Sequence, residues 1–260
     1  MTAAIVAGLV KHFSPQRISV SNRGQEKLAQ LAAKHGINAA PTNEALVNVA
    51  DVVVLSVKPQ ILQAVLAPLA ESIKAKRPLI ISVAAGIPCA SIKKWVGADL
   101  PIIRTMPNVP SAIGEGATGL YAGTDVSQEQ REIAERIFNS IGLCAWVKQE
   151  EEIDLVTALS GSGPAYVMLL LQSMADAAVR KGMSKESAKT LALQTIRGTA
   201  GMIAKSDKPL AQLIDEMLLP GGTTEQAVAA LRQREFPAAI NAAIDAATNR
   251  AGQLAQELGD

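Results

Sequence analysis

The sequence predicts an α/β protein in which a doubly wound parallel sheet is followed by an all-α domain. Three observations support this fold class. Short β-rich runs alternate with helical patterns through the first half of the chain. The longer runs are apolar at nearly every residue, as in strands of a parallel sheet that is covered on both faces. After about Trp146 the strand-like runs stop, and helical patterns rich in Ala and Leu follow.

The first half is predicted to alternate strands and helices. The run at 51–57 reads DVVVLSV, with a β-branched majority, and the run at 78–84 is apolar in the same way. Alternation of such runs with helical patterns is typical of a doubly wound sheet. We expect strands at 17–20, 51–57, 78–84 and 100–106, and helices at 24–35, 59–74 and 88–96.

The second half is predicted to be entirely helical. Several of its helices are apolar around much of their circumference, and aromatic residues make up only 3% of the chain. Broadly apolar helices often bury a face in a partner subunit, so we expect a homodimer or a higher homo-oligomer. We place the domain boundary between residues 149 and 150. The expected helices are 150–159, 164–181, 185–205, 210–218 and 224–258, the last divided near Pro237.

Composition excludes several classes of function. The net charge of +1 lacks the basic footprint of a nucleic-acid-binding protein. Cys89 and Cys144 are far apart and show no metal-ligand spacing with a histidine, so no metal site is expected. No apolar run reaches the roughly 20 residues that span a bilayer. Lys11 follows the first apolar run rather than preceding it, so we expect no secretory signal and a cytoplasmic protein without a membrane partner.

The first expected strand ends in Ser21-Asn22-Arg23-Gly24. At this point in dinucleotide-binding folds an acidic residue binds the ribose of NAD, whereas an arginine can hold the 2′-phosphate of NADP. The sequence has no acid here and has Arg23, whose planar guanidinium suits a phosphate. An ordinary polar turn remains the alternative interpretation.

Three further strands end in unusual loops. Ligands of open α/β sheets gather at the carboxyl ends of strands, so these loops are candidates for a cofactor site. Taken singly, Lys58 reads as a surface lysine. The small side chains after residue 82 permit the backbone to approach a flat ring. The loops are Ser56-Val57-Lys58-Pro59, Val83-Ala84-Ala85-Gly86 and Arg104-Thr105-Met106-Pro107-Asn108-Val109-Pro110.

Two glycine-rich turns lie in the helical half. The first, Ser160-Gly161-Ser162-Gly163-Pro164, predicts a helix start capped by Ser162, and it lacks the G-K-[ST] of a phosphate loop. The second, Pro220-Gly221-Gly222-Thr223-Thr224, precedes Gln226, which has capping-box spacing from Thr223. Glycines before a helix leave N–H groups approachable by a carboxylate or phosphate. A plain Gly-Gly turn between two helices is the alternative interpretation.

These stretches resemble the pyrroline-5-carboxylate reductase family, in their order and along nearly the whole chain. The matching motifs are Val57-Lys58-Pro59, Ser82-Val83-Ala84-Ala85-Gly86, Met106-Pro107-Asn108-Val109-Pro110, Leu159-Ser160-Gly161-Ser162-Gly163-Pro164-Ala165-Tyr166 and Pro220-Gly221-Gly222-Thr223-Thr224.

The resemblance implies reduction of 1-pyrroline-5-carboxylate to L-proline by hydride transfer from NADPH, with NADH as a second donor. It implies an NADP-binding Rossmann domain at 1–149 and a dimerisation and substrate domain at 150–260. Thr224 would be catalytic, with its hydroxyl near the imine nitrogen. The substrate residues implied are Gly221, Gly222, Thr223 and Thr224. The cofactor residues implied are Asn22, Arg23, Asn43, Ser56, Val57, Lys58, Pro59, Val83, Ala84 and Ala85.

Two features depart from the family pattern. Leu218 and Leu219 stand where the family usually has small hydroxyl residues. The family also begins with a strand and a glycine loop, and neither precedes the stretch Met1-Thr2-Ala3-Ala4-Ile5-Val6, which looks like the helix after that loop. We therefore expect that a short native N-terminal segment is missing from this chain.

Two alternatives to the reductase remain open. A β-hydroxyacid dehydrogenase would carry a catalytic lysine shortly after the glycine-rich helix start, but Pro164 to Leu171 contains none. A catalytically silent homologue is favoured only by the missing glycine loop.

Overall fold

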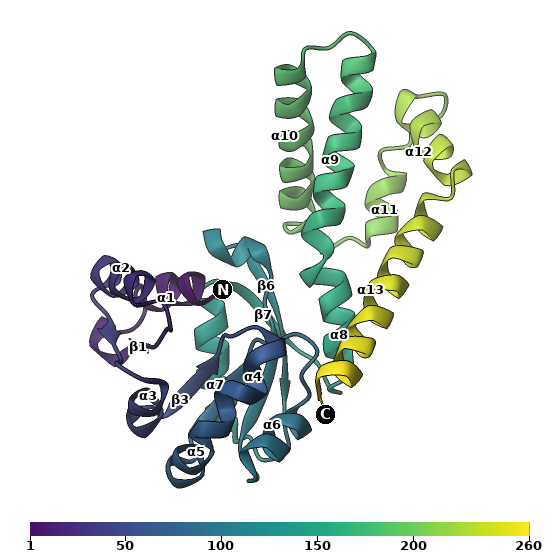
Figure 1. Ribbon diagram of the computed structural model, residues 1–260. Coiled ribbons are helices and arrows are strands. Elements are labelled where there is room, and N and C mark those ends of the chain that lie inside the picture. The colour runs from purple at the N-terminus through teal and green to yellow at the C-terminus, as the bar shows by residue number, and fades with distance from the viewer. Residues whose placement is uncertain (260) are drawn as a thin grey trace. The chain divides into compact units, whose positions relative to one another are not determined.

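The computed structural model describes residues 1–259, which form two compact units (Figure 1). One unit combines Met1–Ser162 with the C-terminal residues from Asp245 onward, and the other is Gly163–Ile244. The first contains all of the strands that the structure describes, and the second is entirely helical. The fold class predicted from the sequence is therefore confirmed, with a Rossmann-like sheet followed by a helical domain.

The main sheet is mixed rather than wholly parallel. Strands β3 (Val52–Leu55), β4 (Leu79–Ser82) and β5 (Ile102–Met106) are parallel and adjacent, as the sequence predicts. Strands β6 (Gly116–Ala122) and β7 (Gly142–Trp146) were not predicted, and β6 runs antiparallel to β5. The short link between β5 and β6 contains only a 3-10 turn, whereas a parallel crossover needs a dozen or more residues.

Helices cover both faces of this sheet. One face packs against α4 (Pro59–Leu66), α5 (Ala70–Lys76) and α6 (Cys89–Val96) through buried residues that include Leu62, Ile73, Ile80 and Ile92. The other packs against α1 (Thr2–Leu9) and α7 (Gln128–Asn139), with Ile5, Ile81, Ile103 and Phe138 in the core.

The helix expected at 59–74 is divided. A 3-10 turn, Ala67–Leu69, separates α4 from α5, and it contains Pro68. Proline has no N–H to donate and its ring clashes with the preceding turn, which ends a regular helix.

A second, small sheet lies beside the main one. Strand β1 (Ser19–Val20) pairs in parallel with β2 (Asn38–Ala39) across helix α2 (Gln25–His35), and α3 (Asn43–Val49) follows. Strands β1 and β3 are not paired with each other. A cavity of about 650 Å³ lies between them, lined by residues of α1, β1, β3 and α7.

The C-terminal half of the last helix, α13 (Phe236–Gly259), packs on the α/β unit. Gly86 has a left-handed φ of 72°, and a Cβ there would lie 3.0 Å from the Cβ of Leu254. Leu258 packs against the core under α6. This return was not predicted, because a helix shared by two units has the same sequence periodicity as a helix that belongs to one.

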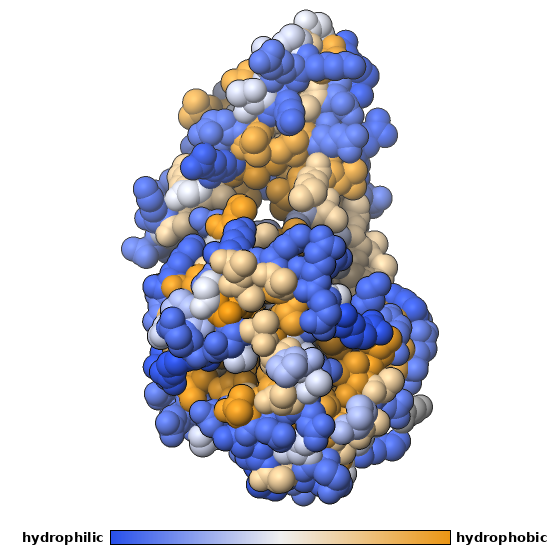
Figure 2. Space-filling view, turned by 60° about the vertical axis from the view of Figure 1, so that its left-hand side comes forward, coloured by the Kyte–Doolittle hydropathy of each residue, from blue (hydrophilic) through white to orange (hydrophobic). Residues whose placement is uncertain are grey.

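The helical unit has almost no core of its own within one chain. It contains α9 (Gly163–Arg180), α10 (Lys185–Ile203), α11 (Leu210–Asp215) and α12 (Thr223–Gln233). Only Ala188 and Ala192 are buried in these helices, while Met168 and Leu169 are each 65% exposed. Figure 2 shows apolar side chains gathered at the surface of this unit.

One helical stretch corrects an expectation. Residues 152–180 form a continuous helix of α8 (Glu152–Val156), a π-helical turn (Thr157–Gly161) and α9. By length and composition alone this stretch is apolar enough to cross a membrane, and little of it is buried. The expectation that no run has this length was wrong, because a few small polar residues interrupt the run without ending the helix.

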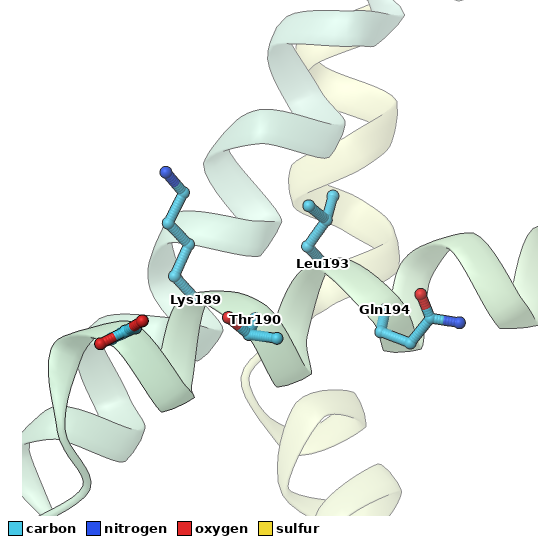
Figure 3. Close-up of a pocket in the computed structure, with 5 residues that line it drawn as sticks. Lys189, Thr190, Leu193 and Gln194 are labelled. Atoms are coloured by element: carbon cyan, nitrogen blue, oxygen red, sulfur yellow. The ribbon is translucent and has the colours of Figure 1, made fainter.

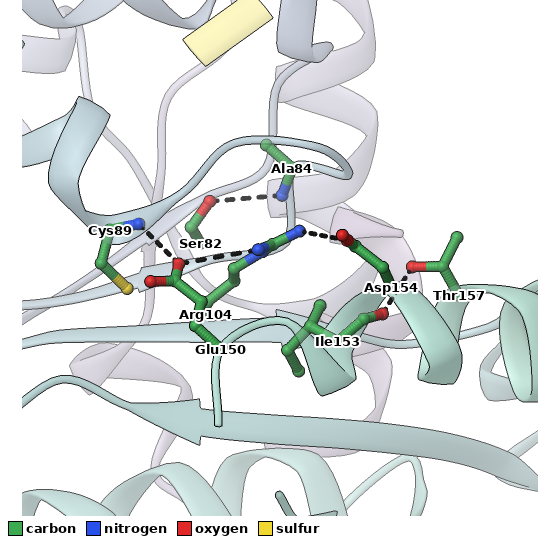
Figure 4. A network of polar contacts seen from close by, with 8 residues as sticks. All are labelled: Ser82, Ala84, Cys89, Arg104, Glu150, Ile153, Asp154 and Thr157. Carbon is green, nitrogen blue, oxygen red and sulfur yellow. Dashed lines mark hydrogen bonds and ion pairs between the residues drawn. The ribbon is translucent and has the colours of Figure 1, made fainter. Parts of the chain in front are cut away.

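A buried ion cluster joins three elements of the α/β unit (Figure 4). Arg104 on β5 is only 3% exposed, and its Nη2 donates to Asp154 Oδ1 at 2.9 Å. Its Nη1 lies 3.6 Å from Glu150 Oε1, which also accepts the N–H of Cys89 at 2.7 Å. The cluster therefore fixes the start of α8 against the sheet and against α6.

Replacing Arg104 with Met should lower the free energy of unfolding by about 3 kcal/mol, because two carboxylates lose their buried counter-charge. Urea unfolding of the purified protein measures this. Arg250→Met is the matched control: the Arg250–Glu257 pair is more than half exposed, so its loss should cost less than about 1 kcal/mol. Equal losses in both variants would show that the Arg104 cluster has no special role.

Candidate functional site

The carboxyl ends of β3 and β4 meet at one edge of the sheet because the two strands are parallel and in register. Ser56 and Val57 follow β3 and are half-buried, while Lys58 is exposed and precedes Pro59 at the first position of α4. The hydroxyl of Thr2, at the start of α1, donates to Ser56 Oγ at 2.9 Å. The first turn of α1 therefore lies against the end of β3.

The loop after β4 offers backbone rather than side chains. Ala84 is only 2% exposed and belongs to the core, while Val83 and Ala85 are half-buried. The N–H of Ala84 donates to Ser82 Oγ at 3.3 Å, which holds the loop in place. Of the three residues predicted here, Ala84 therefore has no free side chain to offer a ligand.

The tip of β1 is open to solvent. Asn22 and Arg23 are both exposed, and Asn22 Oδ1 accepts the N–H of Gly24 at 3.3 Å, which closes a local turn. Asn43 is exposed at the start of α3, where the side chain of Thr42 accepts the N–H of Ala45. The residues of this tip, 21–24, include no acidic side chain, so Arg23 is the one charged residue among them.

The cavity between β1 and β3 brings some of the predicted cofactor residues together. Asn43, Ser56 and Val57 line it, and so does Ser21, which directly precedes Asn22. The other predicted cofactor residues do not line it: Asn22, Arg23, Lys58, Pro59, Val83, Ala84 and Ala85.

The second glycine-rich turn begins α12, but without the predicted capping box. Gly222 is the N-cap of α12, and no side chain caps the helix. The predicted capping box of Thr223 and Gln226 was therefore wrong. Gly221 has a left-handed φ of 73°, which favours glycine because it carries no Cβ. The N–H groups of Thr223 and Thr224 belong to the first helical turn and have no intrahelical acceptor.

Glu225 is a feature of this turn that the sequence analysis missed. Its Oε2 accepts the N–H of Gly221 at 2.8 Å, and the N–H of Gly222 donates to the carbonyl of Leu219. The Glu225 carboxylate thus binds the Gly221 N–H, one of the backbone donors that were expected to be free for a ligand. The glutamate at the third helical position was visible in the sequence and could have suggested this contact.

The turn expected at 160–164 is also different from the prediction. Ser162 has α-helical backbone angles, so it is not an N-cap, and its N–H donates to the carbonyl of Thr157 at 2.8 Å. The chain runs from α8 into α9 through the π-helical turn without a break. Turns of this kind are frequent at functional sites.

The two cysteines are not suited to nucleophilic catalysis. Burial raises the pKa of the Cys89 thiol far above its usual range, and the nearby charge of Glu150 adds to this. Burial also raises the pKa of Cys144, with Glu135 as the second cause. Among residues 1–259 no group of three or more His, Cys, Asp or Glu side chains is placed to hold a metal ion.

A surface pocket of about 410 Å³ lies along α10 (Figure 3). All of its lining residues belong to that one helix, and none is among the predicted site residues: Glu186, Lys189, Thr190, Leu193 and Gln194. We therefore assign it to the exposed surface of the helical unit.

Comparison with known proteins identifies relatives over the whole chain. Residues 150–254 match the family model described as pyrroline-5-carboxylate reductase dimerisation, and residues 1–86 match one described as NADP oxidoreductase, coenzyme F420-dependent. A pyrroline-5-carboxylate reductase of Pseudomonas aeruginosa is 43% identical over 260 residues, covering 100% of this chain and 95% of the relative. One from Synechocystis is 39% identical, covering 99% and 96%.

Solved structures agree with these relatives. The pyrroline-5-carboxylate reductase of Coxiella burnetii superimposes with a TM-score of 0.93 at 39% identity, covering 97% of this chain and 94% of the other. The Plasmodium falciparum enzyme, solved with NADP bound, gives a TM-score of 0.85 at 30% identity, with 97% and 94% covered.

Proposed function

The chain belongs to the pyrroline-5-carboxylate reductase family, and on this premise we propose that it reduces 1-pyrroline-5-carboxylate to L-proline. The single observation that carries this proposal is the 43% identity to a reductase along the entire chain. The reaction adds a hydride to the ring carbon of the C=N bond and a proton to its nitrogen. The carbon is reduced, and the nicotinamide is oxidised.

The cofactor is NADPH, with NADH as a second donor. When bound, NADPH supplies the hydride. The residues present fit it: Arg23 offers an exposed guanidinium at the end of β1, and no carboxylate stands there to repel a phosphate. We assign the adenosine end to Asn22, Arg23 and Asn43. The rest of the cofactor is assigned to the loops after β3 and β4, namely Ser56, Val57, Lys58, Pro59, Val83, Ala84 and Ala85, with Ala84 acting only through its backbone.

The substrate is a small carboxylate, and we assign it to the turn that begins α12. A helix N-terminus favours an anion because its first N–H groups lack partners and its dipole is positive there. Gly221, Gly222, Thr223 and Thr224 form this turn, and the Thr224 hydroxyl is assigned to the imine nitrogen. Leu218 and Leu219 offer no hydroxyl, so backbone N–H groups and the threonines carry the binding.

This chemistry needs little from acid–base side chains. A protonated imine is a strong electrophile, so the protein mainly has to hold the substrate and the hydride donor in a reactive geometry. That requirement fits a chain that has only two histidines. It also fits the two cysteines, because the pKa of each thiol is raised.

The assembly is a homodimer or a larger homo-oligomer in the cytoplasm. Residues 150–254 match a dimerisation model, and the helices of this region leave large apolar side chains exposed. The apolar stretch 152–180 lies in this region, so we assign its exposed face to a second copy of the chain rather than to lipid. The functional division is placed at 149/150, with cofactor binding before it and dimerisation and substrate binding after it.

The proposed activity is tested by following NADPH oxidation at 340 nm on adding 1-pyrroline-5-carboxylate to the purified chain. Proline should accumulate in step with the NADPH consumed. A protein that is folded and oligomeric but consumes no NADPH would refute the proposal and favour a silent homologue.

Arg23→Ala should raise the KM for NADPH about tenfold and leave the KM for NADH within twofold, since only NADPH carries the 2′-phosphate. Steady-state kinetics with both cofactors measure this. Lys27→Ala, on the exposed surface of α2, is the control for a general loss of positive charge. An equal rise for both cofactors would remove Arg23 from the phosphate site.

Thr224→Val should lower kcat at least tenfold, because general acid assistance contributes about 10²–10⁴ in rate. Its effect on stability should be small, because α12 uses no side-chain cap. Thr224→Ser is the matched control and should keep most of the activity. If the valine variant works as well as the serine variant, the hydroxyl takes no part in the reaction.

Glu225→Gln should lower the KM for 1-pyrroline-5-carboxylate about two- to fivefold at low salt, because a charge near a helix N-terminus is worth about 0.3–1 kcal/mol. The native carboxylate competes with the substrate carboxylate for the Gly221 N–H. The difference between variant and native enzyme should shrink in 0.5 M NaCl. A raised KM would show instead that Glu225 orders the turn for the substrate.

A further inference from the structure

Ser160 lies in the π-helical turn, and its carbonyl lacks the usual α-helical hydrogen-bond donor. In a regular α-helix the carbonyl of residue 160 accepts the N–H of residue 164. Residue 164 is a proline, which has no N–H. The carbonyl of Ser160 therefore has no α-helical donor at residue 164, and a donor from elsewhere in the molecule can bind it.

Asn108 supplies that donor from the loop after β5. Its Nδ2 donates to the carbonyl of Ser160 at 3.0 Å, across 52 residues of sequence. Its Oδ1 accepts the N–H of Ala117 on β6 at 2.9 Å. Asn108 is 8% exposed, so one buried amide is held at both ends and ties the helix to the sheet.

The helix around Ser160 also packs closely against strands β5 and β6. A Cβ on Gly161 would lie 2.8 Å from Met106 Cε at the end of β5, and one on Gly119 would lie 2.6 Å from Val156 Cγ1. The helix therefore touches β5 and β6 closely: a side chain on Gly119 would meet Val156, and one on Gly161 would require Met106 to shift. One turn earlier, Asp154 is paired with Arg104.

The location connects Asn108 with the proposed reaction. It follows the carboxyl end of β5, which is parallel to β4, the strand whose following loop we assign to the cofactor. The chain leaves the α/β unit directly after Ser162, two residues beyond the carbonyl that Asn108 holds. The residues assigned to the substrate all lie beyond this point. The turn is therefore the last part of the α/β unit that the chain passes before these residues.

We propose that Asn108 is a positioning residue for hydride transfer, which acts by holding the Ser160 turn where Pro164 removes the internal donor. This inference rests on the proposed reductase activity. Asn108 acts through the helix and not on the reacting atoms. Because misplacing reacting groups by about 1 Å can cost a hundredfold in rate, its loss should affect turnover more than cofactor binding.

The test uses Asn108→Asp in the full chain. Aspartate keeps the acceptor for Ala117 and loses the donor for Ser160. We expect kcat to fall about ten- to hundredfold, with the KM for NADPH changed less than twofold. Amide hydrogen exchange of a peptide covering 157–166 should become about tenfold faster, since one buried hydrogen bond is lost.

Two further variants make the result specific. Asn139→Ala is the matched control, because Asn139 Oδ1 accepts a backbone N–H, that of Cys144 at 3.2 Å, far from the Ser160 turn in sequence. Neither kcat nor exchange at 157–166 should change in it. Adding Pro164→Ala to Asn108→Asp restores an N–H at residue 164, and it should recover much of the protection and of kcat.

The outcomes separate this proposal from the proposed function. Native kcat and native exchange in Asn108→Asp would overturn the positioning role, and so would an equal loss in Asn139→Ala. If the native chain does not reduce 1-pyrroline-5-carboxylate, the activity assignment fails. The exchange data on the same variants then still decide whether Asn108 holds the turn. If Asn108→Asp does not fold, Asn108→Ser, which keeps a smaller polar group, is measured in the same way.

Discussion

The helical unit cannot bury its apolar surface within one chain, and much of the structure follows from this constraint. Helices α9, α11 and α12 contain no buried residue, and α10 buries only two alanines. Exposed apolar patches of this kind mark interaction sites in soluble proteins. A match to a dimerisation model over 150–254 agrees with a second copy as the cover. The proposed oligomer would provide that cover.

A unit without its own core depends on how firmly its two ends are held. At the first end, Arg104 pairs with Asp154, and Asn108 binds the carbonyl of Ser160. At the other end, α13 returns to the α/β unit, where Leu254 meets Gly86. Arg104 and Asn108 are buried, and their contacts are hydrogen bonds or ion pairs of defined geometry. These contacts fix the parts of the α/β unit from which the chain enters and leaves the helical unit.

The sequence predicted the fold class and the first three strands of the main sheet because their apolar runs are continuous and rich in β-branched residues. It missed β6 and β7, which read GATGLYA and GLCAW, because they show no alternation and contain a single β-branched residue, Thr118. Small residues stand in β6 because Val156 packs where a Cβ on Gly119 would lie. The capping-box spacing at Thr223 misled because Gly222 caps the helix instead. The contacts of Glu225 and Asn108 were missed because hydrogen bonds to side chains leave no periodic signal in the sequence.

Sedimentation velocity combined with an activity assay tests most directly whether the proposed oligomer is the active form. The purified chain would be diluted stepwise, and its mass and its NADPH oxidation per chain would be measured at each concentration. We expect a dimer or a larger assembly at high concentration, and activity per chain that falls in parallel with dissociation. A monomer that keeps full activity per chain would contradict the account.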